Sequence, residues 1–210
     1  MTTAPQDPAL LLGRLGVSRE SLDRLKTFVD LLLQWQKHIN LIGPSTIDTV
    51  WWRHILDSVQ LLPLLPPATR SIAELGSGAG IPGLILAIAG NFEVHLYESN
   101  GKKAAFLREA IRKLGLSGHV HSVRLESLVN AHDLPDVQCV VARALAPLPL
   151  LLDYASPFLT KGAIGLFHKG QDVDIELTDA TKYWKLQFLK HPSLCDSRGV
   201  ILEIKEATRV

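Results

Sequence analysis

The sequence predicts an α/β fold in which a helical cap precedes a mostly parallel β-sheet that ends in an antiparallel strand pair. Three observations lead to this prediction. Apolar side chains recur at helical spacing over residues 18–62, short apolar runs alternate with helical patterns over 71–169, and two last apolar runs are separated by only eight residues. At about 150 residues per domain, 210 residues provide one such domain and an extension.

Two helices are expected in the N-terminal part. Ser18 is a suitable N-cap for the first helix. The apolar residues of this helix recur every three or four positions, at Leu22, Leu25, Phe28, Leu32 and Trp35. A second helix carries on one face Ile47, Trp51, Ile55, Val59 and Leu62. The proline-rich stretch 61–70 ends this region, so we expect a helical cap over residues 1–65 and a second domain over 66–210.

The second domain is expected to hold the sheet. Five apolar runs, separated by stretches long enough for crossover helices, predict parallel strands over 71–75, 93–98, 119–125, 137–143 and 163–169. The last two runs, 183–190 and 199–206, are too close together for an ordinary crossover helix. We therefore expect them to pair antiparallel.

Composition excludes some functional classes. Net charge is +1, from 22 basic and 21 acidic residues, so any nucleic-acid site has to be a local patch. The longest uncharged stretch, Leu75–Phe92, contains five glycines and a proline, which favours a loop and a buried helix over a membrane span. The N-terminus lacks a signal-peptide layout, and Cys139 and Cys195 are expected to be reduced thiols in a cytoplasmic protein. We expect no metal site and a monomer.

The stretch 74–83, ELGSGAGIPG, is the main candidate binding loop. It lies at the carboxyl end of the first predicted strand, where open α/β sheets bind ligands. Gly76, Gly78 and Gly80 would let the backbone turn tightly and approach a ligand closely. In another frame, Gly78, Gly80 and Gly83 form the G-x-G-x-x-G fingerprint of dinucleotide-binding proteins, so the loop alone does not identify its cofactor.

The surroundings of the loop favour S-adenosyl-L-methionine over a nicotinamide. Glu74 precedes the loop, the sheet is expected to end in an antiparallel pair, and no hydride-transfer constellation follows. Glu98 ends the second predicted strand, where a carboxylate can accept hydrogen bonds from both ribose hydroxyls. This element order resembles the Rossmann-like class I S-adenosylmethionine-dependent methyltransferases. In that class an acidic residue at about Glu74 helps to position the amino-acid part of the cofactor.

Several short motifs resemble one family over nearly the whole chain. They are Trp35 with Asn40-Leu41, R-H-I-L-D-S over 53–58, LGSGAGIPG over 75–83, Glu98-Ser99 with Lys102-Lys103 and Phe106-Leu107, Arg143-Ala144, Lys169-Gly170 and Arg198-Gly199. The sequence is identified as a member of the bacterial 16S ribosomal RNA guanine-N7 methyltransferases, called RsmG or glucose-inhibited division protein B (GidB). The glycine loop occurs in many methyltransferases, whereas the motifs on either side of it are more particular to this family.

The resemblance implies that Gly76, Ile81, Leu125, Glu126 and Arg143 contact the cofactor. Together with the loop and strand-end residues Ser77, Gly78, Gly80 and Glu98, they form the expected cofactor-binding set. Two positions depart from the family pattern: Ile81 replaces the usual Phe, and Glu74 replaces the commoner Asp. Both changes are conservative, so they leave the expected cofactor unchanged.

The resemblance also implies the substrate, the guanine at position 527 in the 530 loop of 16S rRNA, either as free RNA or within the small ribosomal subunit. Guanine N7 has a lone pair and no proton to lose, so its methylation needs no general base. Arg143 is therefore expected to position the base, with a structural ion pair as the alternative. His54, Asp57 and Ser58 share one helix face, which would touch the site or form a buried network that docks the cap.

Contacts to RNA need local positive charge. Five cations against two acids, net +3, occur between Glu98 and Lys113. The candidates for RNA contact are Arg53, His54, Lys102, Lys103, Lys169 and Arg198. Two other interpretations remain open from the residues alone: a class I methyltransferase that acts on a small molecule or a protein, and a non-catalytic nucleotide-binding module.

Overall fold

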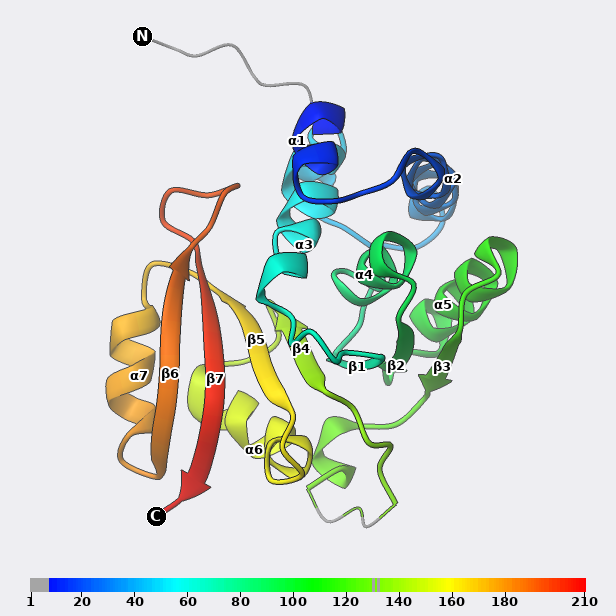
Figure 1. Ribbon diagram of the computed structural model, residues 1–210. Coiled ribbons are helices and arrows are strands. Elements are labelled where there is room, and N and C mark those ends of the chain that lie inside the picture. The colour runs from blue at the N-terminus through cyan, green and yellow to red at the C-terminus, as the bar shows by residue number, and fades with distance from the viewer. Residues whose placement is uncertain (1–7, 130, 132) are drawn as a thin grey trace, which may run out of the picture.

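The computed structural model describes residues 8–129, 131 and 133–210. Its sheet has seven strands in the order β3-β2-β1-β4-β5-β7-β6 (Figure 1). The first five strands of that order are parallel, and β7 is antiparallel to both β5 and β6. The predicted α/β class, the parallel sheet and the terminal antiparallel pair are confirmed.

The strands are β1 (Ser71–Leu75), β2 (Glu93–Tyr97), β3 (Gly118–His121), β4 (Cys139–Arg143), β5 (Ile164–Lys169), β6 (Trp184–Pro192) and β7 (Val200–Arg209). The helices are α1 (Pro8–Arg14), α2 (Arg19–Gln36), α3 (Asp57–Val59), α4 (Gly83–Gly90), α5 (Gly101–Leu114), α6 (Leu148–Leu159) and α7 (Val173–Ala180). The third strand is shorter than predicted, because the chain turns after His121 and forms a 3-10 turn at Leu125–Ser127.

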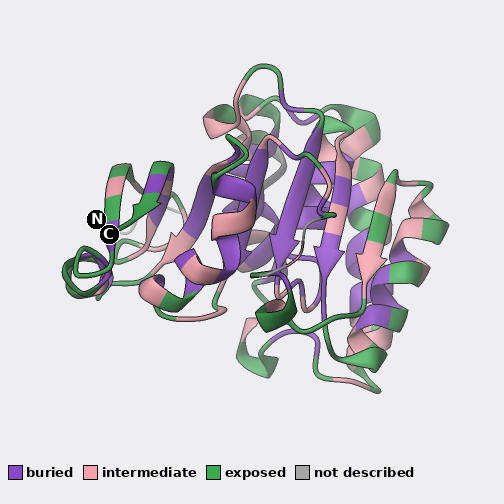
Figure 2. Ribbon diagram, turned by 90° about the horizontal axis from the view of Figure 1, so that it is seen from below, coloured by how far each residue is buried: buried purple, intermediate pink, exposed green. Residues whose placement is uncertain are grey.

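Helices cover both faces of the sheet. On one face, α2 packs against α4 and α5, and these helices share a hydrophobic cluster with alternate residues of the central strands. On the other face, α6 packs against β4, β5 and β7, and α7 packs against α6, in a second cluster. Figure 2 shows the central strands buried between the two layers. Every residue of β1 is buried, as expected for a strand covered on both faces.

The first cap helix is confirmed, whereas the second differs from the prediction. Ser18 caps α2, since its Oγ accepts from the Ser21 N–H at 3.0 Å. In place of one regular helix, residues 44–64 form a 3-10 turn, a π-helix at Trp51–Leu56, α3 and another 3-10 turn. A π-helix has more residues per turn than an α-helix, and apolar periodicity alone did not reveal it.

The cap is continuous with the sheet domain in its packing. Phe28 and Leu32 of α2 and Ile55 of the π-helix belong to the same cluster as Leu84 of α4. Residues 1–7 of the predicted cap lie outside the described residues, and the boundary at residue 65 stays a prediction. Within the described residues, helices of the length and apolar character needed to cross a bilayer are absent.

Candidate active site

The glycine loop follows β1 and depends on glycine at two positions in particular. Gly76 and Gly80 have φ values of +66° and +71°, in the left-handed region that favours glycine. A Cβ on Gly76 would lie 2.5 Å from Leu145 Cδ1, and one on Gly80 would collide with Leu84. The loop is therefore packed tightly between α4 and the segment that follows β4.

Glu98 joins the end of β2 to this loop. Its Oε2 accepts from the Gly78 N–H at 2.8 Å, and its Oε1 accepts from the Asn100 N–H at 2.7 Å. The carboxylate is 9% exposed and borders a cleft of about 320 Å³. Each carboxylate oxygen has a further lone pair for a ligand hydroxyl, as the ribose role predicted for Glu98 requires.

The cleft lies at the carboxyl ends of β1 and β2, and its lining fits the nucleoside part of S-adenosylmethionine. Glycine backbone and Glu98 form one side, and Leu125 with Glu126 form another, where Tyr154 donates to Glu126 Oε1 at 3.2 Å. The apolar side chains of Leu145 and Leu150 also line it. Polar acceptors for hydroxyl and amino groups thus occur beside apolar surface for a base, a combination typical of cofactor sites.

The structure places only part of the predicted cofactor set in this cleft. Gly76, Gly78, Glu98, Leu125 and Glu126 line it. Ser77, Gly80, Ile81 and Arg143 are not among its lining residues. Ser77 and Ile81 are buried, and Ile81 belongs to the same hydrophobic cluster as residues of the cap helices. Ser77 and Ile81 therefore pack under the loop and do not face the cleft.

Glu74 lies under the loop and is buried, with 1% of its surface exposed. Its Oε1 accepts from the Gly83 N–H at 3.0 Å, at the start of α4. Its Oε2 has no hydrogen-bond partner among the described residues. Burial raises the pKa of Glu74 to about 8, and the nearby carboxylate of Glu98 acts in the same direction. Glu74 does not line the cleft.

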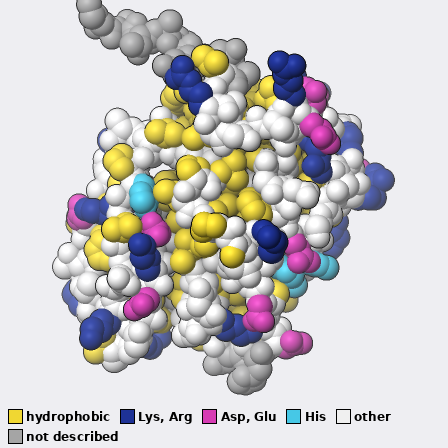
Figure 3. Space-filling model, in the orientation of Figure 1, with side chains coloured by type: hydrophobic (Ala, Val, Ile, Leu, Met, Phe, Trp, Pro, Cys, Tyr) yellow, Lys and Arg dark blue, Asp and Glu magenta, His cyan; other side chains and the backbone are white. Residues whose placement is uncertain are grey.

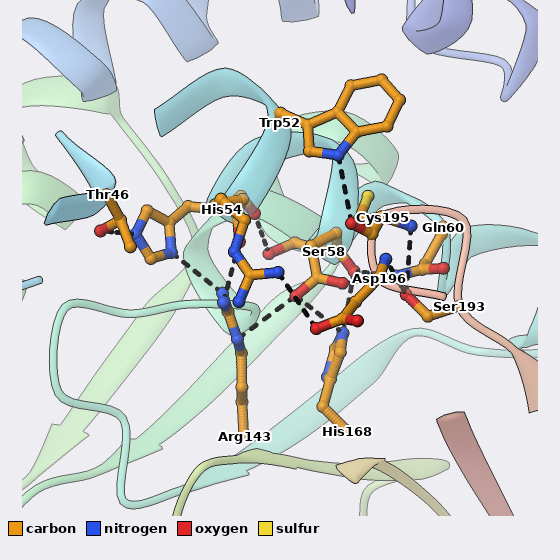
Figure 4. A network of polar contacts seen from close by, with 12 residues as sticks. Thr46, Trp52, His54, Ser58, Gln60, Arg143, His168, Ser193, Cys195 and Asp196 are labelled. Atoms are coloured by element: carbon orange, nitrogen blue, oxygen red, sulfur yellow. Dashed lines mark hydrogen bonds and ion pairs between the residues drawn. The ribbon is translucent and has the colours of Figure 1, made fainter. Parts of the chain in front are cut away.

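Arg143, at the carboxyl end of β4, extends toward the cap instead of toward the cofactor cleft (Figure 4). Its Nε lies 3.3 Å from Asp57 Oδ2, and one terminal nitrogen donates to the Arg53 carbonyl at 2.8 Å. The other lies 3.0 Å from His54 Nδ1. Since a guanidinium only donates, His54 Nδ1 accepts, and His54 Nε2–H donates to Thr46 Oγ1 at 2.8 Å.

His54 is therefore neutral in this network. Burial lowers its pKa to about 4, and the charges of Arg143 and Arg53 act in the same direction. Ser58 donates to the His54 carbonyl at 2.6 Å, so its hydroxyl is hydrogen-bonded within the cap segment. His54, Asp57 and Ser58 are all buried. Of the two alternatives for these residues, the structure corresponds to the network that docks the cap.

The loop that joins β6 and β7, residues 193–199, forms the hairpin tip and contacts the same network. Trp52 Nε1 donates to the Cys195 carbonyl at 3.2 Å, and Arg53 pairs with Asp196 at 3.3 Å. Gln60 accepts from the Leu194 N–H at 2.8 Å. His168 of β5 contacts the Asp57 carbonyl at 2.8 Å. Both cysteines are free thiols, as predicted.

The predicted RNA-contact residues divide into three groups. Lys102 and Lys103 lie in the first turn of α5, and Lys103 also lines the cofactor cleft. Arg53 and Arg198 lie near Asp196 at the hairpin tip, where Arg198 is exposed. Lys169 lines a cleft but pairs with Glu176, so its charge is not free for a phosphate. His54 is buried.

The sequence did not predict several residues that lie in or near the site. Arg124 and Tyr154 line the cofactor cleft, and Arg124 could have been found because it directly precedes Leu125. Glu176 comes close to Lys169 because α7 packs against α6, where the Leu148 N–H also donates to Glu176, so spacing in the sequence gives no signal for it.

Comparison with known proteins identifies the family. A family model described as GidB, rRNA small subunit methyltransferase G, matches residues 21–201. The "Ribosomal RNA small subunit methyltransferase G" of Rhodospirillum rubrum is 48% identical, covering 96% of this chain and 98% of that protein. Its counterpart from Paramagnetospirillum magneticum is 46% identical over 96% and 97%.

The solved structures show the same fold. An O-methyltransferase from Bacillus cereus, described in complex with SAH, has a TM-score of 0.58 and 16% identity, covering 86% of this chain and 91% of that chain. At that identity the likeness concerns the fold alone. With a family model over most of its length and relatives at nearly half identity, the chain belongs to the rRNA small subunit methyltransferase G (GidB) family.

Proposed function

We propose that this protein transfers a methyl group from S-adenosyl-L-methionine to N7 of a guanine in 16S rRNA, at position 527 in the 530 loop. Family membership over nearly the whole chain carries the proposal. The cleft beside Gly78 and Glu98 supports it, because its lining fits the nucleoside of the methyl donor. The activity is that of an S-adenosylmethionine-dependent 16S rRNA (guanine-N7)-methyltransferase.

Methyl transfer to guanine N7 requires little from the protein beyond alignment of N7 with the methyl group. When bound, S-adenosylmethionine supplies a methyl group on a positively charged sulfur. Guanine N7 attacks with a lone pair in the ring plane and loses no proton, so the described residues need not supply a general base. Glu98 and Glu126 would hold the nucleoside through their free lone pairs. The loop from Ala144 to Pro147 lies between this cleft and a second one, where the protein can place the base.

The RNA-binding surface is expected to be small. On the face shown in Figure 3, Lys and Arg side chains are interspersed with Asp and Glu around a central hydrophobic area. Beside the cofactor cleft, Lys103 and Arg124 add positive charge, and Lys102 lies next to them on α5. A patch of this size supports phosphate contacts without strong non-specific binding.

This charge distribution favours a structured partner. A nearly neutral protein selects RNA by shape and accessible bases more than by charge, so we propose that it acts on 16S rRNA within a small-subunit particle. The working state is a monomer. The compartment that follows from a 16S rRNA substrate is the cytoplasm.

Mapping 7-methylguanosine in 16S rRNA tests the function directly. RNA from cells that lack the gene should lose the modification at position 527, and expression of the wild-type chain should restore it. A Glu98→Ala variant, with its cofactor site impaired, should restore much less. An unchanged modification map after loss of the gene would overturn the proposal.

A further inference from the structure

A second cleft, of about 500 Å³, opens at the carboxyl ends of β4 and β5. It shares Leu145 and Ala146 with the cofactor cleft, so the two are neighbours separated by one short segment. Ala144, at the start of this segment, has a φ of +50°, a conformation that is costly for alanine and typical of functional loops. A base in the second cleft would lie beside the bound methyl donor.

One charged pair lies in the wall of this cleft, which is also lined by His168 and Asp172. Lys169 Nζ donates to Glu176 Oε2 at 2.5 Å and to the Ala146 carbonyl at 3.0 Å. Glu176 Oε2 also accepts from the Leu148 N–H at 2.6 Å, at the start of α6. The two side chains are 7% and 23% exposed, so the pair is held in place by surrounding structure.

The pair keeps one donor and one acceptor for a ligand. An ammonium has three N–H groups, and two of those on Lys169 are used by the described residues. Glu176 Oε1 has no hydrogen bond within the described part of the chain, although the residue lines the cleft. The wall therefore presents an N–H donor next to a carboxylate acceptor.

This order of donor and acceptor matches guanine. Guanine presents the acceptor O6 next to the donor N1–H, whereas adenine presents a donor amino group next to the acceptor N1. Contacts to O6 and N1–H leave the N7 lone pair free for the methyl group. An arginine that reads O6 and N7 together would occupy that lone pair, and Arg143 instead binds Asp57 and the cap.

We propose that Glu176, with Lys169 beside it, selects guanine as the base to be methylated, by accepting from N1–H while Lys169 donates to O6. Glu176 would thus be a specificity-determining residue. The inference rests on the proposed function, because it concerns the base that the proposed reaction consumes.

The test compares small-subunit particles reconstituted with 16S rRNA that carries either guanine or 2,6-diaminopurine at the modified position. Diaminopurine keeps N7 and the 2-amino group but exchanges the acceptor at position 6 for a donor and N1–H for an acceptor. The wild-type protein should prefer guanine in kcat/KM by roughly 10- to 100-fold. In Glu176→Gln, whose amide can donate or accept, the preference should fall to within about threefold.

Asp174→Asn is the matched control. It removes one acid from the same helix, and Asp174 is exposed and paired with Lys190 at the surface. This variant should keep the wild-type preference. Binding of S-adenosylhomocysteine should be within about twofold of wild type in both variants, which shows that the cofactor cleft is intact. If Glu176→Gln fails this check, Glu176→Asp replaces it, since the shorter side chain withdraws the acceptor.

The outcomes separate the two proposals. Equal methylation of both RNAs by the wild-type protein would overturn the role of Glu176. So would a Glu176→Gln variant whose rates on both RNAs fall in parallel, because a purely structural residue gives that result. A wild-type protein that methylates neither RNA would overturn the proposed function itself.

Discussion

Glu74→Gln is expected to make the protein more stable near neutral pH. Glu74 is fully buried, one of its oxygens has no hydrogen-bond partner among the described residues, and burial raises its pKa to about 8 from an ordinary value of 4.5. In the unfolded chain the carboxyl group ionises freely above pH 4.5. In the folded protein it stays protonated until about pH 8, so folding opposes its ionisation.

The sign and size of the effect follow from linkage. The stability contributed by Glu74 is fully present below pH 4.5 and is lost as the pH rises toward 8. At about 1.4 kcal/mol per pKa unit, the free energy of unfolding at pH 7 is lowered by about 3 kcal/mol. The Gln variant still accepts from the Gly83 N–H and does not ionise, so this loss disappears.

Urea unfolding of both proteins without cofactor, at pH 5, 6, 7 and 8, measures the effect. The difference in free energy of unfolding between Glu74→Gln and wild type should grow by about 3 kcal/mol over that range. Glu109→Gln is the control, because the pKa of Glu109 is lowered by its hydrogen bond with Arg112, and its difference should stay flat. A flat difference for Glu74→Gln as well would refute the reasoning.

Three further predictions concern the network and the cofactor cleft. Asp57→Ala leaves the Arg143 guanidinium without its carboxylate partner and should lower the free energy of unfolding by about 3 kcal/mol; a loss below about 1 kcal/mol in urea unfolding would contradict this. Gly80→Ala combines an unfavourable φ with a collision against Leu84 and should cost about 2–4 kcal/mol, measured as a lower Tm; an unchanged Tm would argue against the tight loop. Glu98→Gln weakens the charged acceptor beside Gly78 and should raise the Kd for S-adenosylhomocysteine about tenfold in calorimetry; unchanged affinity would remove Glu98 from the cofactor site.

The fold was predictable because its signals are local. Ser18 caps a helix through its own side chain, and a glycine loop directly after a buried strand marks the carboxyl edge of a parallel sheet. The cofactor cleft was predictable in part for the same reason: Gly76, Gly78 and Glu98 follow strand ends. The connection of only eight residues between the last two apolar runs indicated the antiparallel pair at the end of the sheet.

The remaining parts depend on tertiary packing. The π-helix at Trp51–Leu56 places the His54 side chain and the Arg53 carbonyl in contact with Arg143. Apolar periodicity does not distinguish this π-helix from a regular helix. The partners of Lys169 could not be predicted, because Glu176 is held near it by the packing of α7 against α6. The same limit applies to Asp196, which meets Arg53 across 143 positions of sequence.

The contacts between the hairpin tip and the cap join segments that are synthesised far apart in time. Trp52 is synthesised 143 residues before Cys195, the partner of its indole N–H. At about 5–20 residues per second, this corresponds to a delay of roughly 7–30 s during translation. For that interval the early segment of a nascent chain has no access to Cys195 or Asp196, and Gln60 also waits for Leu194. The contacts between the cap and the hairpin tip therefore form only after residues 194–196 have been synthesised, so chains that stop before residue 194 would lack them.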